Sequence, residues 1–320
     1  MQRSETNIEK MWRAFFARLK QLKNMTQFLT SAPRFKLNED LVLSDVTALQ
    51  LKECLAKLRF RKTIYDDWDF ASVDPMGLCT VINFYGPPGT GKTMAAEAIA
   101  GQLGLQFLSL GIAEIESKFL GDTAKNIRAA FDAARDEQAL LFFDEADTLL
   151  GKRLSSVTQG VDNEVNAMRS TLLIELERFN GIIVFATNFE RNYDQAFRSR
   201  IGYHIHFDLP DYPARRRLWE RLLVPGIPLN MTREQVLNLC AELSEGFSGR
   251  EIRTCMRLAL PKALLAAEAI GTAPALDQLH LTEAIAEVKR AMQHVASPAT
   301  SFLPANDTTV ARRLLGVHNS

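Results

Sequence analysis

The sequence predicts an α/β fold in which helices cover both faces of a parallel β-sheet and a smaller all-helical part follows. Two observations carry this prediction. Five short apolar runs alternate with stretches whose apolar residues recur at helical spacing, and after Pro210 the strand-like runs stop. Strands that are apolar throughout are typical of a parallel sheet buried on both faces. The change near residue 210 predicts a domain boundary there.

The five apolar runs define the expected strands, which are Thr80–Tyr85, Leu105–Leu110, Ala139–Asp144, Ile182–Asn188 and Tyr203–Phe207. Helices are expected from Asp45 to about Leu58, over Met94–Leu103, and from Asp122 through Phe131, where apolar residues recur at helical spacing. The all-helical part is expected to contain helices near Ala214–Leu223, Arg233–Leu243, Arg250–Ala267 and Leu281–Met292. Residues 296–320 are polar and contain two prolines, so we expect a loose tail.

The composition is that of a globular protein, with 320 residues, 47% hydrophobic and 24% charged residues, and a formal net charge of zero. A neutral chain has no overall field that would attract nucleic acid. The four cysteines form no C-x-x-C pair, which is typical of thiols in a reducing compartment. No apolar signal core begins the chain, and no apolar run reaches the ~18–20 residues that span a bilayer. We expect a cytoplasmic protein.

Residues 1–36 are expected to form a separate basic amphipathic helix. Thr6 and Glu9 fit a capping box. One face carries Ile8, Met11, Trp12, Phe15, Phe16, Leu19 and Leu22, and the segment holds eight cations (Arg3, Lys10, Arg13, Arg18, Lys20, Lys23, Arg34 and Lys36) against Glu5 and Glu9. Such a helix either packs on its own domain with a solvated basic face, or binds a membrane surface or an acidic partner.

A phosphate-binding motif follows the first expected strand. Gly86-Pro87-Pro88-Gly89-Thr90-Gly91-Lys92-Thr93 matches G-x-x-x-x-G-K-[ST] between a strand and a helix that begins at Met94. The glycines let backbone N–H groups turn toward a phosphate, and the helix N-terminus adds positive potential. Lys92 is expected to reach the β- and γ-phosphate oxygens, and Thr93 to give its hydroxyl to Mg²⁺.

Two further strands are expected to complete this site. The apolar run Leu140–Phe143 ends in Asp144-Glu145-Ala146-Asp147. Asp144 is placed to hold Mg²⁺ through water, and Glu145 to act as general base on the attacking water. A Glu directly after the Asp predicts hydrolysis rather than binding alone, and Asp147 is interpreted as a helix or loop carboxylate. If the strand ending in Asn188 lies beside that of Asp144, Asn188 can orient the water.

These elements, in this order and spacing, resemble the AAA+ ATPases, and within them the AAA type. The similarity lies in "YGPPGTGKTMAAEAIA" (Walker A), "SKFLGDTAKNIRAAFDAA", "LLFFDEADTLLGKR" (Walker B) and "VFATN", and it covers about residues 38–295. It is in the neighbourhood of spastin, katanin and the FtsH protease. The resemblance implies ATP and Mg²⁺ as ligands, a sheet of strand order 5-1-4-3-2, and a ring of subunits, usually a hexamer. It divides the chain into residues 1–36, a nucleotide-binding part 37–210, a helical lid 211–295 and the tail 296–320.

The resemblance also assigns residues that the motifs alone do not. An arginine that completes the neighbouring subunit's site is expected at Arg200, with Arg198 as second choice, because the family has adjacent arginines where this chain reads Arg-Ser-Arg. In the lid, Gly249 is expected to approach the nucleotide. Arg250 either reaches the nucleotide or pairs with a nearby glutamate. The segment Asp67–Phe70 corresponds to the linker that lines the adenine pocket in relatives.

The loop after the second strand points to the use of hydrolysis. In relatives that thread a peptide, an aromatic residue of this loop lines the central channel, and Lys118-Phe119-Leu120-Gly121 matches it, with Phe119 as the gripping side chain. The alternative for Phe119 is a buried anchor. The leading hypothesis is a ring that remodels, unfolds or threads a protein substrate. The alternative is a nucleotide-controlled switch on nucleic acid, which only the basic N-terminal segment supports.

One further pair of residues suggests a metal site. His204 and His206 stand on one face of the fifth expected strand, but no third ligand is evident in the sequence. We therefore interpret them as surface residues of the strand.

Overall fold

The computed structural model describes residues 28–74, 79–111, 115, 122–151, 160–188 and 193–296. By packing, the chain divides into two compact units. The first holds the described residues up to Leu218 together with Glu245–Arg250, and the second holds Trp219–Ser244 and the described residues from Glu251 onward. The predicted domain limits stay predictions, because this division runs through two helices rather than between residues 210 and 211.

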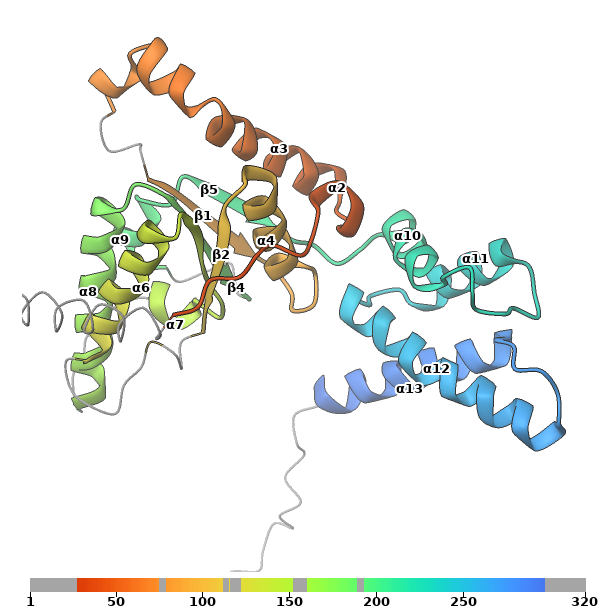
Figure 1. The fold of residues 1–320 in the computed structure, drawn as a ribbon. Coiled ribbons are helices and arrows are strands. Elements are labelled where there is room, and N and C mark those ends of the chain that lie inside the picture. Colours follow the sequence, from red (N-terminus) through yellow and green to blue (C-terminus); the bar gives the residue numbers. More distant parts are fainter. Residues whose placement is uncertain are drawn as a thin grey trace, which may run out of the picture. The chain divides into compact units, whose positions relative to one another are not determined.

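The first unit is built around a parallel sheet (Figure 1). Its strands are β1 (Thr80–Tyr85), β2 (Gln106–Leu110), β3 (Ala139–Phe143), β4 (Ile182–Thr187) and β5 (Tyr203–His206). They lie in the order β2-β3-β4-β1-β5, which confirms the predicted order read from the other edge. Each expected strand is found to within one residue at either end. The remaining elements of this unit are α2 (Leu37–Asp40), α3 (Asp45–Arg59), the short helices η1 (Thr63–Asp67) and η2 (Phe70–Ser72), α4 (Lys92–Leu103), α6 (Asp122–Asp136), α7 (Asp147–Leu150), α8 (Gly160–Arg178), α9 (Gln195–Arg198) and most of α10 (Tyr212–Leu222).

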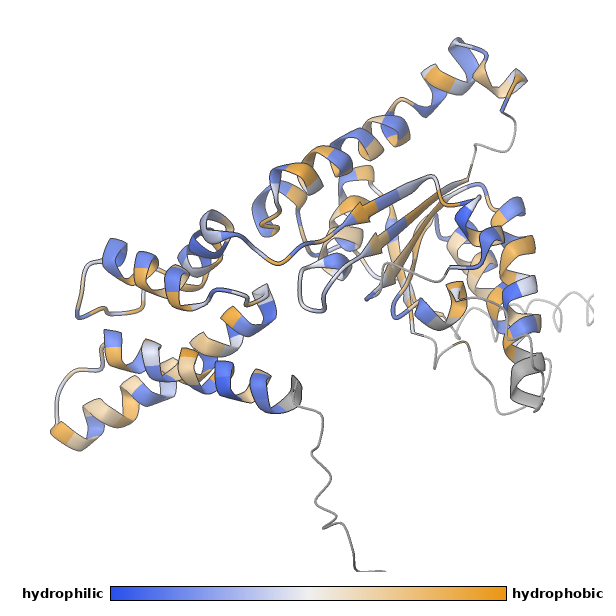
Figure 2. Cartoon of the chain, turned by 180° about the vertical axis from the view of Figure 1, so that it is seen from behind, coloured by the Kyte–Doolittle hydropathy of each residue, from blue (hydrophilic) through white to orange (hydrophobic). Residues whose placement is uncertain are grey.

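Helices cover the sheet on both faces because its strands are apolar on both. On one face α6 and α8 pack against side chains such as Phe143 and Phe185, and on the other α3 and α4 pack against Phe84 and Phe142. Figure 2 shows the strands in the colours of apolar residues and the outer helix faces in those of polar residues. Phe131 of α6 is fully buried, as its helical spacing predicts.

Helix α8 is an element that the sequence analysis did not predict. Its signal was present, since Val165, Met168, Leu172 and Leu176 recur every three to four residues, and Met168, Leu172 and Leu176 are buried. The polar residues at its start, within "VDNEVN", made this apolar periodicity less evident in the sequence.

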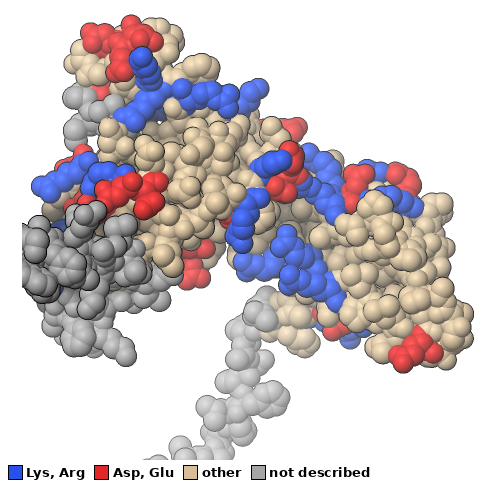
Figure 3. All heavy atoms as spheres, viewed as in Figure 1, with Lys and Arg blue, Asp and Glu red and all other residues tan. Residues whose placement is uncertain are grey.

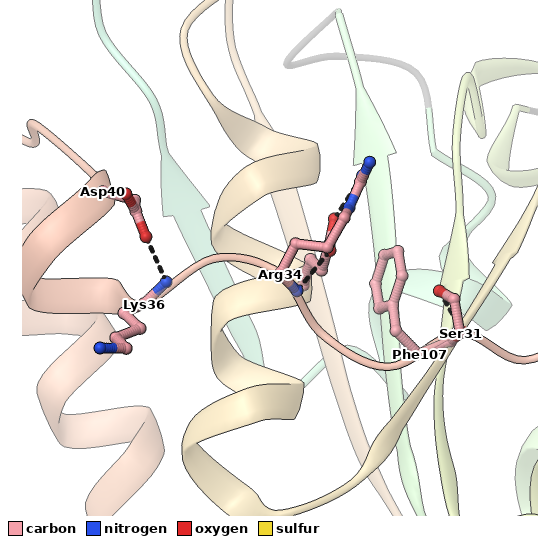
Figure 4. A network of polar contacts seen from close by, with 6 residues as sticks. Ser31, Arg34, Lys36, Asp40 and Phe107 are labelled. Carbon is pink, nitrogen blue, oxygen red and sulfur yellow. Dashed lines mark hydrogen bonds and ion pairs between the residues drawn. The ribbon is translucent and has the colours of Figure 1, made fainter.

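Residues 28–36 correct the prediction of a helix over residues 1–36; the part before residue 28, including the basic face, lies outside the described residues. This stretch is not helical. Ser31 pairs with Phe107 at the edge of β2, and Pro33 disfavours a helical residue before it. Arg34 donates to the Glu97 carboxylate of α4 from its backbone N–H at 2.8 Å, from Nε at 2.9 Å and from Nη2 at 3.0 Å (Figure 4). Residues 31–36 thus connect the N-terminal side of the chain to β2 and to α4, the helix that follows the phosphate motif.

The second unit is all-helical, as predicted. It contains α11 (Arg233–Leu243), most of α12 (Gly249–Ile270) and α13 (Gln278–Ala296). Thr232 and Gln235 form a capping box at the start of α11. The buried indole of Trp219 donates to Ser244 Oγ at 3.0 Å, and Ser244 Oγ donates to the Cys240 carbonyl at 2.6 Å. Burial raises the pKa of Cys240 to about 12, so this thiol serves as an apolar core residue.

Charges of both signs are spread over the described surface. In Figure 3 Asp and Glu side chains lie beside Lys and Arg at several places on the visible face. None of the helices in the described part of the chain has the length and apolar character that a membrane crossing requires.

Candidate nucleotide site

The carboxyl ends of three neighbouring strands bring the predicted site residues to one edge of the sheet. β4 pairs with β1 on one side and with β3 on the other. Residues 86–91 follow β1, Asp144 follows β3 and Asn188 follows β4. The condition set for Asn188, that its strand lies beside that of Asp144, is therefore met. In open α/β sheets this edge is where ligands bind.

The glycines of the phosphate motif have backbone angles that other residues rarely adopt. Gly86, Gly89 and Gly91 have φ values of +137°, +78° and +101°. A Cβ on Gly86 would lie 2.1 Å from the Phe207 carbonyl oxygen, and a Cβ on Gly89 would lie 2.4 Å from Ser248 Oγ. The loop therefore requires glycine at these two positions. Its backbone curves into a concavity of the kind that binds phosphate through N–H groups.

The Lys92 ammonium lies at the mouth of this loop. Nζ donates to the carbonyl oxygens of Gly86 at 2.7 Å and Pro87 at 3.0 Å, and to Asn188 Oδ1 at 3.2 Å. The residue is buried, and this burial lowers the pKa of Lys92, while the Asp144 and Asp147 carboxylates act in the opposite direction. A cation held between the loop and the end of β4 is placed to meet phosphate oxygens.

Asp144 and Thr93 form a set of oxygen ligands. Thr93 Oγ1 donates to Asp144 Oδ2 at 3.5 Å, and Asp144 Oδ1 accepts from the Glu145 N–H at 3.0 Å. A hydroxyl and a carboxylate are oxygen ligands of the kind that Mg²⁺ prefers, with waters completing its shell. These residues therefore fit the ion.

Glu145 stands in a strained turn with an exposed side chain. Its φ is +51°, in the left-handed region that a residue with a side chain seldom adopts. Such strain is concentrated at functional positions, where surrounding contacts hold it. Here the Ala146 N–H donates to the Ala186 carbonyl of β4 at 2.8 Å, so the turn is fixed to the neighbouring strand.

Asp147 has a larger part in the site than its sequence interpretation gave it. It lies in the first turn of α7, as expected of a helix carboxylate, but its Oδ2 also accepts from the backbone N–H of Asn188 at 3.3 Å. Asp147 thus holds the residue that faces Lys92. The only sequence signal for this was its position three residues after Asp144.

Gly249 and Arg250 begin α12 and belong by packing to the first unit. The Gly249 Cα faces the carbonyl oxygen of Gly89, and Arg250 contributes to lowering the pKa of Lys92. Ser248 Oγ accepts from the Arg250 N–H at 3.2 Å. Both predicted residues therefore lie beside the phosphate loop, which makes Arg250 a second cation of this edge.

The assignment of Asp67–Phe70 to the adenine pocket is wrong. α3 runs against the direction of the strands: Thr47 near its start donates to the His206 carbonyl at the carboxyl end of β5, at 2.8 Å. Arg61 just after its end donates to Asn180, which precedes β4. The segment after α3 therefore lies at the amino ends of the strands, opposite the phosphate loop (Figure 1).

The two candidate arginines differ in their surroundings. Arg200 forms an ion pair with Glu177 of α8 and donates from Nη1 to the Ala196 carbonyl at 2.7 Å. Arg198 is exposed, and its side chain has no hydrogen-bond or ion-pair partner within the described part of the chain. Arg198 is therefore the more available of the two to a neighbouring molecule, which reverses the order expected from sequence.

The remaining predicted residues are the loop 118–121 and the two histidines of β5. The loop residues Lys118, Phe119, Leu120 and Gly121 lie outside the described residues. His204 stacks on Tyr193 and His206 on Tyr85, with ring centroids 6.4 Å and 4.9 Å apart. Across the described ranges, no three His, Cys, Asp or Glu residues are grouped as a metal site would need.

The family model "ATPase family associated with various cellular activities (AAA)" matches residues 82–209, which hold the phosphate loop, Asp144, Glu145 and Asn188. The matched segment is 128 of the 320 residues, so the similarity to the AAA family is shown for this part of the chain. The AAA match begins in β1 and ends beyond β5, so it includes the carboxyl edge described above.

Two relatives and one solved structure are similar to this chain. The chain is 34% identical to Fidgetin-like protein 1 of Drosophila melanogaster over 183 residues, covering 55% of this chain and 34% of that protein. It is 33% identical to Spastin of Drosophila erecta over 178 residues, covering 52% of this chain and 22% of that protein. The chain thus spans about a third or less of these relatives' length. The crystal structure of the FIGL-1 AAA domain in complex with ADP matches with a TM-score of 0.64 at 22% identity, over 92% of this chain and 95% of that one, which shows a shared fold.

Proposed function

We propose that this chain is an AAA ATPase, which hydrolyses ATP, assembles with copies of itself, and uses the hydrolysis to remodel a protein substrate. The observation that carries the proposal is the convergence of Lys92, Asn188, Asp144 and Glu145 on one edge of the sheet. Binding of a phosphate chain needs a cation such as Lys92, and hydrolysis needs a carboxylate that can take a proton from water.

ATP would bind with its phosphates in the loop of residues 86–91 and at the N-terminus of α4, where Thr93 and Met94 follow Lys92. Gly249 and Arg250 lie beside this loop and are proposed to contact the nucleotide. The connection between α2 and α3, residues 41–44, lies at the carboxyl edge and replaces Asp67–Phe70 as the proposed neighbour of the adenine. Its position rests on the bond from Thr47 to His206 and on Arg217, which donates to the Leu43 carbonyl at 3.3 Å.

Hydrolysis transfers the terminal phosphoryl group to water. Glu145 accepts a proton as the water oxygen bonds to the γ-phosphorus and the bond to the bridging oxygen breaks, which leaves ADP and phosphate. Asn188 orients the water, and Lys92 balances negative charge on the transferred group. Thr93 and Asp144 would hold Mg²⁺, which would supply positive charge to the β- and γ-phosphates.

Two further features motivate the assembly and the substrate. Arg198 is exposed, as expected of an arginine that acts on a neighbouring subunit's ATP, and Arg200 is the second candidate. Phe119 and its neighbours Lys118, Leu120 and Gly121 are proposed to line the channel of a hexameric ring and to grip the polypeptide. ADP in the FIGL-1 AAA domain supports the nucleotide part of the proposal alone. The basic N-terminal segment is a candidate tether to a partner or membrane surface, and the proposed location is the cytoplasm.

Substitution of Phe119 separates hydrolysis from its use. Phe119→Ala should hydrolyse ATP at a rate within about twofold of the wild type, because residue 119 belongs to none of the motifs that form the nucleotide site. It should lose most remodelling of a folded reporter protein that carries an unstructured tail. Leu29→Ala, at an exposed apolar residue of the N-terminal stretch, serves as the control. Remodelling by Phe119→Ala at the wild-type rate would disprove the gripping role, and an inactive wild type would disprove the function.

A further inference from the structure

A buried polar cluster lies behind the nucleotide edge, in a part of the sheet that is otherwise apolar. Asn83 is fully buried in the centre of β1. Its Nδ2 donates to the hydroxyl oxygen of Tyr193 at 3.1 Å, and that hydroxyl shares a 2.8 Å hydrogen bond with Thr187 Oγ1 at the end of β4. Buried polar groups are retained at a cost unless they are bonded, and Asn83 Oδ1 has no partner in the described part of the chain. Packing alone does not account for such a cluster.

Tyr193 connects the segments that carry the site. Its backbone forms a bridge with Gly151, and the N–H of Asp194 donates to the Leu150 carbonyl at 2.8 Å, which ties it to the end of α7. Its hydroxyl holds Thr187, the residue directly before Asn188. Tyr193 therefore contacts the end of the helix that begins with Asp147 through its backbone, and the end of the strand that leads to Asn188 through its hydroxyl.

Tyr193 also stands directly before the segment that carries the arginines. Asp194 is the N-cap of α9, and its Oδ1 accepts from the Ala196 N–H at 2.9 Å. Arg198 lies at the end of this four-residue helix. The Tyr193 ring stacks on His204 of β5, which fixes the ring against the sheet on the side of α9. A shift of Tyr193 thus moves the start of α9 and the end of β4 together.

We propose that Tyr193 is a positioning residue of the ATPase reaction, whose hydroxyl fixes Asn188 relative to the arginine segment Gln195–Arg200. This inference rests on the proposed function. Its physical basis is the narrow range of donor–acceptor distances over which a hydrogen bond forms. Asn188 Oδ1 lies 3.2 Å from Lys92 Nζ, close to the upper limit, so a displacement of the β4 end by about 1 Å breaks the contact. Misplacement of a reacting group by about that amount can cost about 10²-fold in rate.

Removal of one oxygen atom tests the role. Tyr193→Phe keeps the ring and its stacking but withdraws the partner of Asn83 and Thr187. In the full chain, kcat for ATP should fall about 10- to 100-fold while KM changes less than about twofold, because the phosphate loop is untouched. The matched control is Tyr65→Phe, a buried tyrosine that packs on Phe70 at the opposite end of the sheet; its kcat should equal that of the wild type.

A second variant separates positioning from stability. Asn83→Val together with Tyr193→Phe replaces both partners of the hydrogen bond between Asn83 and Tyr193 by apolar groups. The double variant should recover much of the melting temperature that Tyr193→Phe alone loses. The inference predicts that kcat stays low in this double variant. Recovery of kcat together with the melting temperature would show a purely structural role, and a wild-type kcat in Tyr193→Phe would overturn the inference outright.

Amide hydrogen exchange decides the coupling independently of turnover. In the nucleotide-free full chain, Tyr193→Phe should speed exchange at Asn188 and in α9 together, by about tenfold or more, and leave α3 unchanged. Faster exchange at only one of the two segments, or at neither, would contradict the coupling. A wild type without ATP turnover would disprove the proposed function, whereas the exchange result would still test whether Tyr193 links the two segments.

Discussion

Replacement of Gly86 by alanine should both unfold the first unit more easily and destroy the phosphate loop. The new Cβ would lie 2.1 Å from the Phe207 carbonyl oxygen, closer than the 3.0 Å below which real contacts of this kind do not occur. Phe207 cannot easily yield. Its side chain is buried, and its N–H donates to the Tyr85 carbonyl at 2.8 Å. Either this backbone shifts by about 1 Å, or the loop does.

The size of the effect follows from two costs. A residue with a side chain at a φ of +137° costs about 1–3 kcal/mol, because this region is accessible essentially to glycine alone. Loss or distortion of the hydrogen bond between Phe207 and Tyr85 costs about another 1 kcal/mol. We expect Gly86→Ala to lower the free energy of unfolding by about 2–4 kcal/mol, and to abolish ATP binding since the loop must open elsewhere.

Gly104→Ala is the matched control for this prediction. Gly104 ends α4 with a φ of +70°, and a Cβ there meets nothing within 4 Å, so only backbone strain of about 1 kcal/mol applies. Urea denaturation and ATP titration of both variants make the comparison. Equal losses of stability, or retained ATP affinity in Gly86→Ala, would refute the reasoning from the close approach to Phe207.

Two further predictions concern charged groups. The hydrogen bonds from Arg34 hold the pKa of Glu97 below its usual value, so this pair stabilises the fold above that usual value and loses its effect as pH falls through the lowered one. Arg34→Met should therefore lower the melting temperature at pH 7 more than the control Lys36→Met, which removes the exposed pair with Glu39 (Figure 4). The difference between the two variants should shrink toward pH 3. A difference that persists at that pH would contradict the role of the Glu97 charge. Arg198→Ala should reduce ATP turnover of the assembled protein by about 10³-fold or more. Arg200→Ala should act mainly on thermal stability, because it removes the ion pair with Glu177. A larger loss of turnover in Arg200→Ala than in Arg198→Ala would show that Arg200 is the arginine that completes the neighbouring subunit's site.

Much of the fold was accessible from sequence because its signals are local. Apolar runs located the strands to within a residue, and Gly86 and Gly91 mark the loop by their spacing alone. Asp144 and Glu145 were identified because a buried strand ends at them. The AAA resemblance then supplied the strand order, which local patterns do not contain.

The remaining features depend on direction and on contacts between distant residues. Asp67–Phe70 was misplaced because the resemblance to the linker of relatives says nothing of the direction in which α3 runs in this chain. The pair Arg34 and Glu97 joins residues 63 positions apart, and Asp147 reaches Asn188 across 41 positions. Neither contact has a periodic or motif signal, so only the folded chain reveals it.

The central claim is that Glu145 is the base that makes this site hydrolytic. Glu145→Gln keeps the size and hydrogen-bonding shape of the side chain but cannot accept the proton. The account predicts that this variant binds ATP and Mg²⁺ with an affinity within a few-fold of the wild type, while steady-state phosphate release falls by about 10²–10⁴-fold. Phosphate release at the wild-type rate by Glu145→Gln would contradict the account.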